Sequence, residues 1–108
     1  MTLVLGPLYS GKKAFACKLL HCDESELSHY AVWNVQERAA AAENLELLAE
    51  ELAGYQVVIS TEVGGGVVPV DAEQRAAREA AGRLNCLLAQ RADTVVRVFY
   101  GLPLILKD

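Results

Sequence analysis

Apolar residues gather in short runs that alternate with longer segments in which they recur every three or four positions. Rich in aliphatic, β-branched and aromatic residues, the runs predict strands at residues 3–5, 29–35, 55–61 and 93–100, with a last apolar run at 104–106. The spaced segments predict helices at 14–20, 37–53 and 71–91, with a polar turn at 23–28 and a loop at 62–69. This alternation predicts an α/β fold with a mostly parallel sheet, covered by helices on both faces and ending in an antiparallel hairpin.

Two helix ends carry signals of their own. Gly54 follows the 37–53 helix, as glycine often does at a helix C-terminus, and Asp71 with Gln74 forms a D-x-x-Q capping box before the last helix. The 108 residues contain no repeat, linker or low-complexity segment, so we expect one domain over 1–108.

The first strand runs into a glycine-spaced loop, and residues 3–13 read LVLGPLYSGKK. The spacing G-x-x-x-x-G-K lets backbone N–H groups surround a phosphate, while the lysine adds a charge and the next helix presents its positive N-terminal end. The predicted nucleotide-phosphate site consists of Gly6, Ser10, Gly11, Lys12 and Lys13. Lys13 stands where such loops carry a Ser or Thr whose hydroxyl binds Mg²⁺. An ordinary strand-to-helix turn with solvated lysines is the alternative.

A second candidate feature follows the 55–61 strand. Glu62 comes directly after it, and in open α/β sheets ligands collect at the carboxyl ends of the strands, where an acid can hold Mg²⁺. The glycines at 64–66 would let the backbone approach a ligand closely or move as a lid. A flexible turn with a solvated glutamate explains the same residues.

The last helix carries a polar stripe beside its apolar face, formed by Arg75, Arg78, Gly82 and Asn85 at spacings of three and four. A glycine inside a helix costs roughly 1 kcal/mol relative to alanine, so Gly82 suggests close approach by a backbone or ligand. Arg78 and Asn85 would then serve an anion or fix a loop. The alternative is a solvated face with an ion pair from Arg75 to Glu79.

Charge and hydropathy narrow the classes of partner. The formal net charge of −4 argues against a polynucleotide, whose backbone needs a basic face, whereas a mononucleotide needs only a local cradle. No apolar run reaches membrane-spanning length, and no charged region precedes an apolar one at the start. The sequence therefore predicts a cytoplasmic protein that binds neither nucleic acid nor a membrane.

The three cysteines are expected to be reduced, because they are odd in number and their spacing makes no zinc knuckle. Cys17 and His21 lie four residues apart on the first helix, with Cys22 adjacent. A metal site there is an alternative to simple packing of these side chains.

Several motifs occur in a fixed order along the second half of the chain. They are E-V-G-G-G-V-V-P at 62–69, Arg78-Glu79 followed by Gly82 and Asn85, Ala92-Asp93, and Gly101-Leu102-Pro103-Leu104. The segment W-N-V-Q-E at 33–37 precedes them. With the N-terminal loop, they resemble the bifunctional adenosylcobinamide kinase/adenosylcobinamide-phosphate guanylyltransferases of cobalamin biosynthesis, over about three-quarters of the chain.

The resemblance implies a P-loop NTPase (RecA-like) architecture, ATP or GTP as the nucleotide, Mg²⁺ as its metal, adenosylcobinamide as the corrinoid substrate, and a homo-oligomer. It implies a catalytic role for Lys12 and Glu62, with Glu62 near the metal. The residues implied for the substrate loop and its neighbouring helix are Gly64, Gly66, Pro69, Arg78 and Asn85.

Two segments of the family pattern are missing. One precedes Trp33 and carries, in an H-R-x-x-R-P-like motif, the histidine that is guanylylated; neither His21 nor His29 stands at that place. The other is a strand and helix with a D-C-[LV]-[ST]-like motif before Tyr55. With Lys13 in place of the metal-binding hydroxyl, these losses weaken the predicted Mg²⁺ site and argue against the guanylyltransferase step.

Three hypotheses follow. The leading one is a shortened family member that keeps a nucleotide cradle and phosphorylates the cobinamide aminopropanol hydroxyl. The second is a catalytically degenerate paralogue that acts as a nucleotide-binding or assembly subunit. The third is an unrelated small P-loop kinase, which would be favoured if the 62–69 loop lay far from Lys12.

Overall fold

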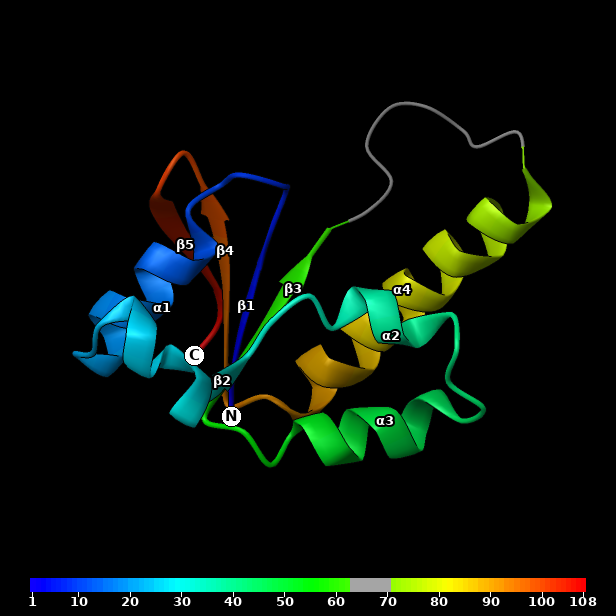
Figure 1. Ribbon diagram of the computed structural model, residues 1–108, viewed down its shortest axis with the longest axis horizontal. Helices are drawn as coiled ribbons and strands as arrows, with labels where there is room; N and C mark the ends of the chain where they lie inside the picture. Colours follow the sequence, from blue (N-terminus) through cyan, green and yellow to red (C-terminus); the bar gives the residue numbers. More distant parts are fainter. Residues whose placement is uncertain (63–70) are drawn as a thin grey trace.

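A computed structural model describes residues 1–62 and 71–108 of the chain (Figure 1). The elements, in order, are β1 (Thr2–Gly6), α1 (Lys12–Leu20), the 3₁₀ helix η1 (Glu24–His29), β2 (Ala31–Val32), α2 (Gln36–Ala39), α3 (Leu45–Leu52), β3 (Val57–Thr61), α4 (Ala72–Arg91), β4 (Thr94–Phe99) and β5 (Leu102–Lys107).

The described strands form one sheet in the order β2-β3-β1-β4-β5. β1 lies at its centre and pairs in parallel with β3 on one side and β4 on the other, so that Val4 stands between Ile59 and Val96. β5 returns antiparallel to β4 at the edge. The predicted mostly parallel sheet, its P-loop-type α/β architecture and its final antiparallel hairpin are confirmed.

Helices cover both faces of the sheet, and each face has its own apolar core (Figure 1). Alternate residues of β1 divide between the two cores: Leu3 and Leu5 pack with α2, α3 and α4, whereas Val4 packs with α1 and η1. This alternation predicts which face each polar residue at the strand ends will occupy. Among the helices of the described residues, none has the length and apolar character needed to span a membrane.

The prediction of one helix over 37–53 is wrong, because two helices, α2 and α3, occupy that segment. Asn44 has an extended backbone, and its side-chain oxygen accepts hydrogen bonds from the N–H groups of Glu46 and Leu47 at 3.0 and 3.2 Å. A residue that caps the start of a helix has an extended backbone, so Asn44 cannot lie inside one continuous helix. The alanine-rich composition, which favours helix everywhere, concealed this start signal.

The strand predicted at 29–35 is also shorter than expected. Only Ala31–Val32 pair with β3, and η1 occupies Glu24–His29, where a polar turn was predicted. Asp23 and Glu26 form a reciprocal capping box at the N-terminal end of η1. Side-chain-to-backbone hydrogen bonds therefore determine the structure of this polar segment.

The long helix α4 begins at Ala72 with Asp71 as its N-cap, and the Asp71 carboxylate accepts a hydrogen bond from the Glu73 N–H at 2.7 Å. The reciprocal capping box predicted between Asp71 and Gln74 is not formed among the described residues. Gly82 is exposed, and a Cβ built on it meets no described atom within 4 Å, so the suggested close approach by a neighbouring backbone is not found among the described residues. Close approach by a ligand stays a prediction.

Replacing Gly82 with alanine should therefore stabilise the protein by about 0.5–1 kcal/mol, the difference in helix propensity. Gly101→Ala is the matched control: its added Cβ also meets nothing, but its φ of 74° is strained for any residue with a Cβ. Urea unfolding should show a gain for Gly82→Ala and a loss for Gly101→Ala. A loss at Gly82 would show that this glycine has a packing role.

Candidate functional site

The glycine-spaced loop at residues 7–11 is held against the turn between β4 and β5. A Cβ on Gly6 would lie 2.5 Å from the Val98 carbonyl oxygen, and one on Gly11, whose φ is 93°, would lie 3.1 Å from the Cα of Gly101. The Gly101 N–H donates a hydrogen bond to the Ser10 carbonyl at 2.8 Å. Close backbone contact therefore excludes a side chain at Gly6, and tight contact with a positive φ disfavours one at Gly11.

Lys12 begins α1 with its side chain inside this loop. The residue is only 8% exposed, and its Nζ donates to the Pro7 carbonyl at 2.6 Å and approaches the Ser10 Oγ at 3.5 Å. Burial lowers the pKa of Lys12, and the negative charge of Glu62 partly opposes that shift. The loop thus holds a poorly hydrated ammonium group among backbone dipoles, which is the arrangement that an incoming phosphate would stabilise.

Lys13 faces a neighbouring aromatic ring. Its Nζ lies 4.4 Å from the centroid of the Trp33 ring, a cation–π contact. Both residues line a hollow of about 320 Å³, together with residues 8–12 and Asn34, Ile59 and Thr61. Two lysines and two aromatic side chains, Trp33 and Tyr9, therefore border the hollow above the loop.

Glu62 follows β3 and lies next to the loop, because its N–H donates to the Gly6 carbonyl at 2.9 Å. Its carboxylate pairs with Arg97 of β4: the Arg97 Nε lies 2.9 Å from one oxygen, and Nη2 donates to the other at 2.9 Å. The guanidinium carbon of Arg97 also lies 4.2 Å from the centroid of the Phe99 ring. Sequence analysis missed Arg97, which looked like one polar residue in an apolar strand.

The polar residues of α4 occupy different environments. Asn85 accepts a hydrogen bond from the Ser60 hydroxyl at 2.6 Å, so it holds the end of β3 to the helix. The Gln36 side-chain oxygen accepts a hydrogen bond from the Thr61 N–H at 3.0 Å, so it also holds the end of β3. Arg78 is half-buried on the same helix. The substrate-loop predictions for Gly64, Gly66 and Pro69 lie outside the described residues.

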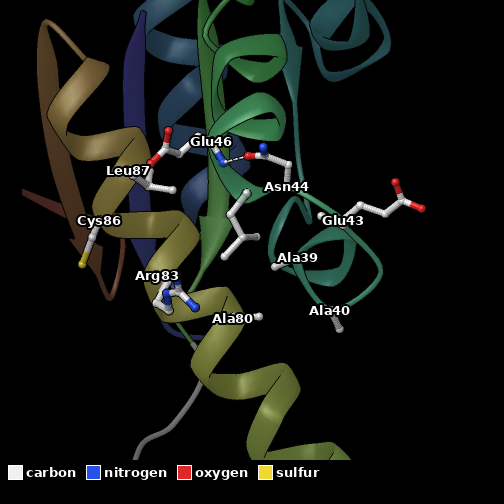
Figure 2. Close-up of a pocket in the computed structure, with 11 residues that line it drawn as sticks. Ala39, Ala40, Glu43, Asn44, Glu46, Ala80, Arg83, Cys86 and Leu87 are labelled. Atoms are coloured by element: carbon white, nitrogen blue, oxygen red, sulfur yellow. Dashed lines mark hydrogen bonds between the residues drawn. The ribbon is translucent and has the colours of Figure 1, made fainter.

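A larger hollow of about 750 Å³ lies elsewhere, between α4 and the connection from α2 to α3 (Figure 2). Alanines from both sides line it, and Figure 2 shows Ala80 and Arg83 of α4 opposite Ala39 and Asn44. The hydrogen bond drawn there is the helix cap in which the Glu46 N–H donates to the Asn44 side-chain oxygen. This hollow is larger than the one above the loop, but it brings none of the predicted site residues together.

Cys17 and Cys22 lie at the C-terminal end of α1, where their backbones close the last turn of the helix. His21 takes a left-handed conformation, and the Cys22 N–H donates to the Cys17 carbonyl at 3.1 Å. Partial burial, with the neighbouring Cys17 thiol, raises the pKa of Cys22. Within residues 1–62 and 71–108, no three His, Cys, Asp or Glu side chains are placed to bind one metal ion.

The lowered pKa of Lys12 predicts how phosphate binding depends on pH. If the charged ammonium contacts a phosphate, affinity for a nucleotide should fall as pH rises through that lowered pKa, which lies below the usual lysine value. In Lys12→Arg the cation does not titrate, so this fall should disappear. Titrations of ATP at a series of pH values test this; an identical alkaline fall in both proteins would assign it to another group.

The family model for cobinamide kinase / cobinamide phosphate guanyltransferase matches residues 33–106, which is more than half of the chain. No curated protein matches the chain. The matched region begins after the glycine loop, so the family match and the loop geometry come from different parts of the molecule. The match shows that this chain belongs to the cobinamide kinase / cobinamide phosphate guanyltransferase family.

Proposed function

We propose that the chain binds the phosphates of ATP or GTP at the loop formed by Gly6, Ser10, Gly11, Lys12 and Lys13. The observation that carries this proposal is the buried Lys12, held inside a loop in which a Cβ would clash at Gly6 and be crowded and strained at Gly11. Membership of a family named for a kinase and a guanyltransferase supports a nucleotide as the ligand.

As its reaction, we propose nucleotide-dependent phosphorylation of the cobinamide hydroxyl, with the guanylyltransferase step lost. Lys12 would stabilise the negative charge of the transferred phosphoryl group. Glu62, whose N–H bonds to the Gly6 carbonyl at the start of the loop, would lie close to the reacting phosphates. The missing segment with the guanylylated histidine supports the loss of the second step. A corrinoid partner, assembly into a homo-oligomer, and substrate contacts of Arg78 and Asn85 belong to the same proposal.

A nucleotide-binding or assembly subunit without catalysis is the second candidate. The ion pair between Glu62 and Arg97 favours it, because a carboxylate held by two guanidinium nitrogens is less available for a reacting group.

Calorimetry tests the phosphate site directly. Lys12→Ala should weaken ATP or GTP binding by about 10-fold or more, since it removes a charge-assisted contact. Lys18→Ala, which removes an exposed lysine of the same helix, should leave the affinity unchanged. Absence of heat with both nucleotides in the unmodified protein would overturn the proposal.

A transfer assay separates the two candidates. If the kinase reaction persists, labelled phosphate should move from ATP or GTP to adenosylcobinamide. Lys13→Ser, which restores the usual hydroxyl after the loop lysine, should raise the rate. Transfer in neither protein, despite nucleotide binding in calorimetry, would favour the binding subunit.

A further inference from the structure

Loops of this type usually bind a nucleotide together with Mg²⁺, which takes a hydroxyl oxygen from the residue after the lysine and an acid at the end of a nearby strand. In this chain, the first position is Lys13. Its ammonium group stands over the Trp33 ring at 4.4 Å. A cation therefore occupies the place from which an oxygen ligand for the metal would come.

The acid at the second position is engaged by Arg97. β1 separates β3 from β4 in the sheet, and Arg97 stands beside Leu5 in register, so its side chain crosses the end of β1 to reach Glu62. The guanidinium group uses Nε and Nη2 to contact both carboxylate oxygens, at 2.9 Å each. This two-point geometry is the strongest that a carboxylate can make with one side chain, and it occupies the oxygens that a metal would need.

Two further contacts fix this pair in place. The Phe99 ring lies 4.2 Å from the guanidinium carbon, and the Glu62 N–H is anchored on the Gly6 carbonyl. Both side chains are partly exposed, at 39% for Arg97 and 30% for Glu62, so solvent weakens the ion pair. Its effect is therefore to position Glu62 rather than to stabilise the fold.

The charges of the site lead to the same conclusion. Lys12, Lys13 and Arg97 are three cationic side chains at or beside the loop, and Glu62 is the acid that contacts one of them. A divalent cation would be repelled by these groups and would find few free oxygen ligands. The donor set therefore does not fit Mg²⁺, whereas it fits a polyanion that carries no metal.

We propose that this phosphate site binds the free polyphosphate of a nucleotide rather than its Mg²⁺ complex. Lys12 and Lys13 supply the positive charge, and Arg97 is a positioning residue that holds Glu62 away from metal coordination. This inference rests on the proposed nucleotide-binding function and specifies the ionic form of its ligand.

Titration of ATP into the unmodified protein by calorimetry tests the inference, once in excess EDTA and once in Mg²⁺ above the ATP concentration. The dissociation constant in EDTA should be equal to or lower than that in Mg²⁺. A value at least 10-fold higher in EDTA would overturn the inference and leave the phosphate site standing. Absence of binding in both buffers would overturn the site and the inference together.

A variant identifies the residue responsible. Arg97→Leu frees the Glu62 carboxylate, so Mg²⁺ should tighten ATP binding at least 3-fold in this variant, and Glu62→Gln added to it should abolish that gain. Arg91→Leu, at the exposed end of α4, should respond to Mg²⁺ as the unmodified protein does. If Arg97→Leu folds, as judged by circular dichroism, and gains no Mg²⁺ response, Arg97 does not have this role. The EDTA comparison needs no variant, so misfolding leaves the main test intact.

Discussion

The contact between the loop at residues 7–11 and the β4–β5 turn is the constraint on which the site depends. Two backbones meet there at distances that exclude a Cβ at Gly6 and crowd one at Gly11, and one hydrogen bond, from Gly101 to Ser10, joins them. Lys12 lies inside this loop and is only 8% exposed. This burial lowers the pKa of its ammonium group.

Much of the fold could be predicted from the sequence, because strands buried on both faces appear as continuous apolar runs. The runs at 55–61 and 93–100 became β3 and β4, and the loop between β1 and α1 carried its own glycine spacing. The prediction of one long helix failed where a capping side chain outweighed a general propensity: Asn44 begins α3 inside an alanine-rich segment. The close backbone approach suggested for Gly82 is not found among the described residues.

The least predictable part of the site was the pairing of Glu62 with Arg97. These residues are far apart in sequence, and they meet only because β1 brings β3 and β4 to its two sides in a particular register. The alternation of side chains adds a second condition: Arg97, like Ser60, stands beside Leu5 and shares its face of the sheet. Without strand order and register, a polar residue in an apolar strand has no identifiable partner. The contact of Lys13 with Trp33 depends in the same way on tertiary structure.

The central position of β1 also determines when the glycine-spaced loop can form during synthesis. β1 is made before both strands that pair with it, which come much later along the sequence, and domains with many such distant contacts fold slowly. The Ser10 carbonyl can accept its hydrogen bond from Gly101 only after the β4–β5 turn has been made. A ribosome-bound chain that has not yet released the β4–β5 turn therefore holds Lys12 in an unfinished loop. The loop that follows β1 therefore reaches its final structure only after β4 and the β4–β5 turn have been made.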